Sequence, residues 1–136
     1  MAGTLKLQIV TPDAVTYSED VESVTLPGEE GEMGIFPMHV PLMTRIVAGE
    51  VWVRKGGRSE FFAVGEGFAE ITGDHVALLT DMAINANSID EAKAEEARHR
   101  AEARLAENLD DEQTAMVSAS LAQSLAQLKV KRRSRG

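Results

Sequence analysis

Apolar and polar residues alternate along the first half of the chain, and this pattern predicts β-strands. Leu5, Leu7 and Ile9 are separated by single polar residues, a period of two that places all three on one face. Similar short apolar segments recur up to residue 80, separated by glycine, proline or aspartate. Short strands at close, regular spacing favour an antiparallel sandwich or barrel. The connections are too short for crossover helices, which argues against a doubly wound sheet.

Two pairs of residues predict tight β-hairpins. The pair Gly56-Gly57 separates two apolar, alternating segments, and the pair Gly73-Asp74 separates two more. Each pair is expected to turn the chain so that the flanking strands become antiparallel neighbours.

The periodicity changes in the last third of the chain, which predicts two helices. Ser88 and Glu91 have the spacing of a capping box, in which each side chain hydrogen-bonds a free backbone N–H of the first turn. Apolar residues then recur at helical spacing on one face. The pattern breaks over residues 108–111, and Asp110 with Gln113 predicts the cap of a second helix.

The short break predicts that the two helices pack as an antiparallel hairpin. Their expected contact faces are rich in alanine: Ala94, Ala97, Ala101 and Leu105 on the first helix, and Ala115, Ala119, Ala122 and Ala126 beside Leu121, Leu125 and Leu128 on the second. Alanine buries little apolar surface, at about 0.8 kcal/mol per CH₂. We therefore expect two units, a sandwich over residues 1–87 and a detachable arm over residues 88–136. The alternative to a detachable arm is a solvent-exposed helical hairpin that has no second docking site.

The composition limits the possible classes of protein. At 136 residues and 43% hydrophobic, the chain fits one domain with an appended element. It has no cysteine, which excludes disulfides, thiolate zinc sites and a cysteine nucleophile. No apolar run approaches the roughly 20 residues that span a bilayer. The first residues have no signal-peptide pattern, so we expect the chain to stay on the ribosome's side of any membrane.

The charge is distributed unevenly along the chain. A net charge of −8 argues against nucleic-acid binding, because phosphate repels an acidic surface. The end of the chain is nevertheless basic. The segment after Leu128 contains no acidic residue and five basic ones: Lys129, Lys131, Arg132, Arg133 and Arg135. This asymmetry indicates a tail that meets an acidic partner.

The sequence contains no recognisable catalytic or metal-binding pattern. His39, His75 and His99 lie in different contexts, and no two have metal-ligand spacing. There is no nucleophile elbow and no phosphate loop. The glycine-containing segment GEEGEMG carries three glutamates, which would repel a phosphate. Nothing in the sequence therefore supports catalysis by this chain alone.

Residues 28–46 combine prolines, glycines, acids and a run of apolar side chains. Pro37 and Pro41 fix φ and remove two N–H donors, so this segment is expected to form a rigid loop or an edge. Several apolar side chains here suit a partner surface: Met33, Ile35, Phe36, Met38 and Met43. Some must instead turn into the core, and Ile35 is the first candidate.

The segment GEMGIFPMHVPLMTRI resembles the signature of the epsilon subunit of F-type ATP synthases, which is called delta in mitochondria. The matching residues are Gly31, Glu32, Met33, Gly34, Ile35, Phe36, Pro37, His39, Pro41 and Leu42. The resemblance extends over the chain, through LKLQIVTPD, FFAVGEGFAEI, VALLTDMAI and IDEAKAEEA. It implies an α+β, mainly β fold, with an antiparallel ten-stranded β-sandwich followed by an antiparallel two-helix hairpin.

The resemblance also implies a function. Such a subunit is a non-catalytic part of the central stalk, the rotor, and couples proton flow to ATP synthesis while its C-terminal helices inhibit ATP hydrolysis. The implied partners are the gamma subunit, the polar loops of the c-ring and, through the arm, the alpha/beta catalytic hexamer. The implied location is peripheral, at the cytoplasmic face of the bacterial inner membrane. Neither a cofactor, nor nucleic acid, nor direct membrane insertion is implied.

Three surfaces follow from the resemblance. The gamma contact is expected at Ile35, Phe36, Pro37, Met38, His39, Val40 and Pro41. The c-ring contact is expected at Glu29, Glu30 and Glu32. The inhibitory tail, which would approach an acidic segment of the beta subunits, is expected at Lys129, Lys131, Arg132, Arg133 and Arg135.

An ATP-sensing module is the alternative function, because some bacterial members of this family bind ATP on the folded arm. Their motif is Ile/Leu-Asp-x-x-Arg-Ala, and the candidate residues here are Ile89, Asp90, Lys93 and Arg100. Lys93 replaces the arginine of that motif, and Gln123 and Gln127 stand where two more arginines are expected. Lysine cannot reproduce the planar fork of arginine and glutamine adds no charge, so we expect weak ATP binding. A third interpretation is a generic acidic scaffold with a basic tail.

Overall fold

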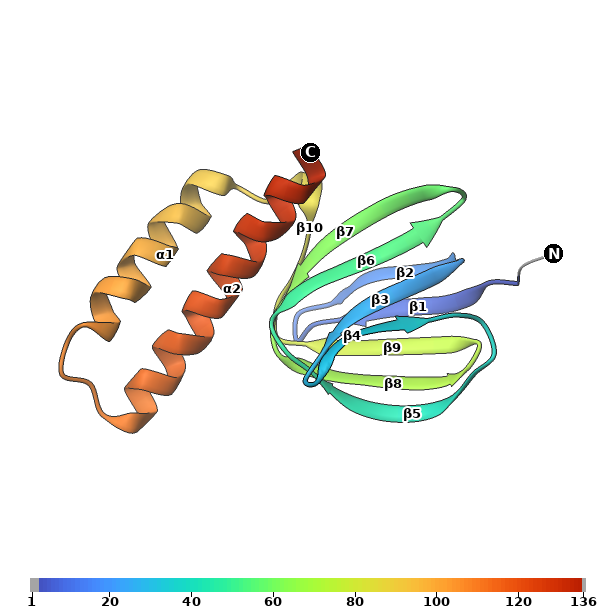
Figure 1. Ribbon diagram of the computed structural model, residues 1–136, viewed down its shortest axis with the longest axis horizontal. Coiled ribbons are helices and arrows are strands. Elements are labelled where there is room, and N and C mark those ends of the chain that lie inside the picture. Colours follow the sequence, from blue (N-terminus) through green and yellow to red (C-terminus); the bar gives the residue numbers. More distant parts are fainter. Residues whose placement is uncertain (1–2, 136) are drawn as a thin grey trace.

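The computed structural model describes the backbone of residues 3–135 and the side chains of residues 3–134. In this part of the chain, ten strands precede two helices (Figure 1). The strands are β1 (Leu5–Val10), β2 (Val15–Val21), β3 (Ser23–Gly28), β4 (Gly31–Ile35), β5 (His39–Ile46), β6 (Gly49–Lys55), β7 (Arg58–Val64), β8 (Gly67–Gly73), β9 (His75–Thr80) and β10 (Ala83–Asn85). A single 3₁₀ turn, η1 (Ala86–Ser88), leads to the helices α1 (Glu91–Leu105) and α2 (Asp111–Arg135). The predicted order of a β-rich part followed by a helical hairpin is confirmed.

The strands form a sandwich of two layers that share one continuous sheet. One layer has the order β4-β3-β6-β7-β10 and the other β5-β8-β9-β1-β2. A single pairing, Gly28 with Ile46, joins β3 to β5 and so connects the layers. On the other side, β2 approaches β6 and β7, where Glu19 forms an ion pair with Lys55. The sandwich is therefore nearly closed.

One pairing differs from the predicted antiparallel sandwich. Strands β1 and β9 pair in parallel, with Leu7 opposite Val76 and Ile9 opposite Leu78. Parallel neighbours need a long connection, and here all of β2 to β8 supplies it. The expectation of an all-antiparallel sheet rested on short local connections and is therefore wrong for the pairing of β1 with β9.

The alternation of apolar residues builds the core between the two layers. Leu5, Leu7 and Ile9 are all buried, together with apolar residues from eight other strands of residues 3–135. The predicted turn at Gly56-Gly57 is also confirmed, since Lys55 pairs with Arg58 across it. Both glycines have positive φ, 58° and 76°, as a tight hairpin of this kind requires.

The first helix begins later than the capping-box pattern predicted. Its N-cap is Asp90, whose carboxylate accepts a hydrogen bond of 3.1 Å from the backbone N–H of Lys93. Ser88 instead ends the η1 turn, which Asn85 stabilises by accepting a bond from the N–H of Asn87. The prediction of Ser88 as the cap is wrong, because this local Asn turn takes up the residues before Asp90.

The second predicted cap is confirmed. The N–H of Gln113 donates to Asp110 Oδ1 at 2.7 Å, and the N–H of Asp110 donates to Gln113 Oε1 at 3.2 Å. Such reciprocal bonds satisfy two backbone donors that the first turn of α2 leaves free. The helix then continues without a break through the basic end of the chain to Arg135.

Only α2 of the two helices lies directly against the sandwich, and α1 packs on the far side of α2 (Figure 1). The contact is a second apolar cluster, made of Ala63, Ala86, Ile89, Ala126 and Val130, with Phe61, Met82 and Ile84 around it. We call it the docking cluster. Alanines do contribute to the arm as predicted, but Val130 is fully buried and stands within the run that the sequence marked as a basic tail. The expectation that the arm offers only an alanine-rich face is therefore wrong.

None of the helices in residues 3–135 combines the length and the apolar character needed to cross a membrane.

Candidate subunit-docking surfaces

The loop between β4 and β5 presents apolar side chains to solvent on a fixed backbone. Met38 is 85% exposed, and Phe36 and Val40 are also exposed, whereas Ile35 is buried as predicted. Met38 has a φ of 66°, which is uncommon for a residue other than glycine. Its N–H donates to Asp74 Oδ1 at 3.2 Å, so the β8–β9 turn holds this conformation. The structure thus stabilises an outward-facing methionine.

The two prolines have the predicted effect on β5. Apart from one pairing at its end, the strand pairs only with β8, and the register shifts between His39 and Leu42 where Pro41 lies. His39 is the first residue of the strand, and its Nδ1 atom lies 2.6 Å from the carbonyl oxygen of Val40. Because a carbonyl oxygen can only accept a hydrogen bond, Nδ1 is the donor. The expectation of a loop or edge is confirmed, the rigidity of the segment stays a prediction, and the seven gamma-contact candidates are consecutive in the chain.

A second group of exposed apolar residues lies on the outer face of the layer that contains β5. Phe68 on β8 pairs with Leu79 on β9, and Leu79 pairs with Val10 on β1. Phe68 and Leu79 are about half exposed, and Val15 on β2 and Met43 on β5 are more so. We call these four exposed residues, together with the partly buried Val10, the outer apolar row.

Apart from Met43, the residues of this row were not predicted to form a surface, although the sequence carries a signal for them. Phe68 shares a strand face with Glu70 and Thr72, so an aromatic residue stands on an otherwise polar face. The adjacent apolar residues Leu78 and Leu79 cannot both face the core of a regular strand. Leu78 is buried, which leaves Leu79 outside beside a shallow hollow flanked by carboxylates.

The acidic candidates lie at the tip of the β3–β4 hairpin. Gly28 pairs with Gly31, so Glu29 and Glu30 are the two residues of the turn, and Glu32 follows at the start of β4. All three glutamates are exposed, and within residues 3–134 none of them forms an ion pair. Strand β4 separates this tip from the loop at Met38, so the two surfaces lie at opposite ends of the sandwich (Figure 1).

The structure does not bring the four ATP candidates together in one groove. Asp90 caps α1, and Ile89 is buried in the docking cluster. Arg100 lines a groove between α1 and α2 with Arg104 and Met116, but Lys93 is not part of that groove.

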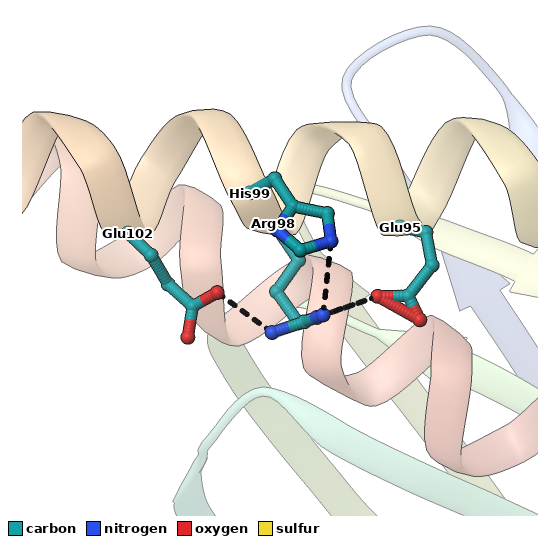
Figure 2. Close-up of polar contacts among 4 residues, drawn as sticks. All are labelled: Glu95, Arg98, His99 and Glu102. Atoms are coloured by element: carbon teal, nitrogen blue, oxygen red, sulfur yellow. Dashed lines mark hydrogen bonds and ion pairs between the residues drawn. The ribbon is translucent and has the colours of Figure 1, made fainter.

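A further arginine on α1 is already neutralised by acids of its own helix (Figure 2). Arg98 donates to Glu95 at 2.7 Å and to Glu102 at 2.6 Å, and it also lies 3.3 Å from His99 Nε2. The hydrogen bond that Arg98 donates to Glu95, followed by the charge of Glu102, raises the pKa of Arg98 above its ordinary value. Arg98 is therefore not available to a triphosphate while these ion pairs are formed. The described residues also include no group of His, Asp or Glu able to hold a metal ion.

The basic run at the end of α2 is not a uniform, unopposed tail. Lys131 Nζ donates to the carbonyl oxygen of Ala86 at 3.2 Å, and Arg133 Nε lies 2.9 Å from Glu50 Oε2. Lys129 and Arg132 are exposed, and the side chain of Arg135 lies outside the described residues. The expectation of unopposed charge is thus wrong for Arg133 while the arm is folded on the sandwich. The inhibitory role of the run stays a prediction.

Comparison with known proteins gives consistent matches over nearly all of the chain. The family model described as ATP synthase, Delta/Epsilon chain, beta-sandwich domain matches residues 4–86, and the one described as ATP synthase, Delta/Epsilon chain, long alpha-helix domain matches residues 87–132. The chain is 40% identical to the ATP synthase epsilon chain of Laribacter hongkongensis, covering 93% of this chain and 92% of the relative. It is 41% identical to that of Syntrophobacter fumaroxidans, covering 96% and 97%.

A solved structure shares the fold. A chain in the Euglena gracilis mitochondrial ATP synthase structure of OSCP, F1 and the c-ring superposes with a TM-score of 0.78. The two chains are 23% identical, and the match covers 95% of this chain and 81% of that one.

Proposed function

The chain belongs to the ATP synthase delta/epsilon chain family, and we propose that it is a non-catalytic central-stalk subunit of a proton-translocating ATP synthase. In this role it couples proton flow to ATP synthesis and restrains ATP hydrolysis through α1 and α2. One observation carries the proposal: a sandwich with a solvent-exposed apolar loop centred on Met38, whose backbone N–H is held by Asp74. Such a surface loses little conformational entropy when a protein partner covers it.

The gamma subunit is the partner proposed for this loop. The seven candidates from Ile35 to Pro41 supply it, although Ile35 contributes from the core rather than by contact. The outer apolar row begins at Met43, two residues after Pro41, and adds exposed apolar side chains on β8, β9 and β2 to the proposed surface. Glu66 and Asp81 flank one end of the row, so a complementary partner carries basic groups there.

The acidic hairpin tip is proposed to face the polar loops of the c-ring. Glu29 and Glu30 form the turn of the β3–β4 hairpin and Glu32 follows them, and all three are exposed at the end of the sandwich opposite the β4–β5 loop (Figure 1). A subunit that binds gamma with one end and the c-ring with the other links the two parts of a rotor. These contacts make the chain a peripheral subunit at the cytoplasmic face of the bacterial inner membrane.

The arm is proposed to reach the alpha/beta hexamer when it leaves the sandwich, and its basic run then contacts an acidic segment. Lys129 and Arg132 are exposed in the folded arm, whereas Lys131 and Arg133, although Arg133 is also exposed, are engaged by Ala86 and Glu50 until the arm is released. Arginine grips carboxylates in a bidentate way, and several exposed pairs act together because each contributes only about 0–1 kcal/mol.

Binding of purified gamma subunit to the full chain tests the proposal. Met38→Glu and Val40→Glu would each place an unpaired carboxylate in a dry interface, which costs about 3 kcal/mol or more and weakens binding roughly a hundredfold. Met116→Glu is the matched control, because Met116 is also an exposed methionine but lies on the arm. If both loop variants bind gamma as tightly as the control does, the gamma surface lies elsewhere.

A further inference from the structure

The C-terminal half of α2 covers a carboxylate on the outer face of β6. The side chain of Glu50 is only 10% exposed, and its Oε2 atom is shielded from solvent with no aligned hydrogen-bond donor in the described residues. Its neighbours on this face are apolar: Ala63 is its pairing partner on β7, and the rings of Trp52 and Phe61 stack 6.1 Å apart beside it. Docking of the arm therefore requires the burial of a charged group, which is unfavourable unless the group is paired or neutralised.

Arg133 reaches this carboxylate from the last turns of α2. Its Nε atom lies 2.9 Å from Glu50 Oε2, and its guanidinium lies 5.8 Å from the centre of the Phe61 ring. Val130, one turn earlier, is fully buried in the docking cluster, so the helix has no freedom to slide while docked. The packing of Val130 thus sets the position from which Arg133 meets Glu50.

Three charges face Glu50: Arg133 and Lys129 attract it, and Glu32 repels it. Burial raises the pKa of Glu50 above its ordinary value even though Arg133 and Lys129 act to lower it. A carboxyl whose pKa is raised in the docked state favours docking in its protonated form. Docking is therefore strongest below the ordinary pKa of a glutamate, weakens as the pH rises from there to the raised pKa of the docked state, and changes no further above it.

We propose that Arg133 and Glu50 form a latch, which allows the arm to dock only when the buried carboxylate is paired with Arg133 or protonated. An arm held by apolar contacts alone would not respond to charge. With the latch, an acidic segment that draws Arg133 away leaves Glu50 buried without a partner and so releases the arm. This last consequence rests on the proposed function, whereas the latch itself is a property of the isolated chain.

The chain contains its own probe of docking. Trp52 is its single tryptophan and stacks on Phe61, which packs against the docking cluster. Release of α2 exposes this pair of rings, so the emission of Trp52 shifts to longer wavelength. Hydrogen exchange of the amides in residues 121–130 reports the same event independently, because an isolated helical hairpin that buries mainly alanine between its helices is marginally stable once undocked.

The test compares full-length variants over a pH series from mildly acidic to mildly alkaline. Arg133→Gln is expected to reduce amide protection in α2 about tenfold or more at neutral pH, with protection recovering as the pH falls. Glu50→Gln is expected to retain protection and to lose the pH dependence. In the Glu50→Gln background, Arg133→Gln is expected to have little further effect. Arg132→Gln is the matched control on the exposed side of the helix and should change nothing.

Two results would overturn the latch. In the first, Arg133→Gln behaves like Arg132→Gln at every pH. In the second, Arg133→Gln has the same effect with and without Glu50, which would mean that Arg133 acts only by packing on Phe61. Amide protection in β1 and β9 checks in every variant that the sandwich is folded. Because no gamma subunit is present, failure of the latch and failure of the proposed function are distinguishable.

Discussion

Val130→Ala tests whether the docking cluster holds the arm on the sandwich. Val130 is fully buried between α2 and the sandwich, so the substitution removes two methyl-sized groups from an apolar contact. At about 0.8 kcal/mol per buried CH₂ this loses about 1.6 kcal/mol, and the cavity left behind adds several tenths. Alanine is the better helix former by up to about 0.7 kcal/mol, which acts in the opposite direction. The net loss is about 1.5 kcal/mol, roughly tenfold in the docking equilibrium.

Native-state hydrogen exchange measures this loss separately from the stability of the sandwich. Amides in the second half of α2 should lose about tenfold protection, while those of β1, β8 and β9 keep theirs. Met116→Ala is a suitable control, because Met116 lines the groove between α1 and α2 rather than the contact with the sandwich. It should leave docking nearly unchanged.

Two outcomes would refute this reasoning about the arm. Unchanged protection in α2 would mean that the docking cluster contributes nothing to holding it. An equal loss of protection in α2 and in the core strands would mean that sandwich and arm unfold as one unit. In that case residues 88–136 would not be a detachable arm.

Two further predictions follow from the same structure. A chain ending at Asn87 should stay folded, because the core between the layers contains no helical residue. Circular dichroism typical of strands and cooperative unfolding would check this, and an aggregated or unfolded product would contradict it. The isolated full-length chain should bind ATP only weakly, because Asp90 is occupied as a helix cap and Arg98 is neutralised by Glu95 and Glu102. Micromolar binding measured by calorimetry would show this to be wrong. Arginine at positions 93, 123 and 127 should tighten any residual binding.

Local signals in the sequence predicted most of the individual elements. The period-two pattern of Leu5, Leu7 and Ile9 and the turn at Gly56-Gly57 both depend on neighbouring residues, and both are confirmed. The cap of α2 at Asp110 is local in the same sense. The prediction of Ser88 as the cap of α1 was wrong although this signal is local too. Asn85 forms a turn over the preceding residues, and the helix therefore begins after Asp90.

Features that join distant parts of the chain could not be read in this way. The parallel pairing of β1 with β9 depends on how the whole sandwich closes. The ion pair of Glu50 with Arg133 joins the middle of the chain to its end, and the sequence around either residue does not indicate its partner. The outer apolar row is intermediate, because an aromatic residue on a polar strand face was visible at Phe68. The fixed, outward position of Met38 depends on Asp74 from another turn.

Site-specific photocrosslinking in the assembled ATP synthase tests the central claim most directly. A photoreactive residue at position 38 lies on the exposed loop proposed to bind gamma, and one at position 58 lies at the turn of the β6–β7 hairpin in the other layer. The account predicts a crosslink to the gamma subunit from position 38 and none from position 58. A crosslink to gamma from position 58 alone, or from position 38 to a different subunit, would contradict it.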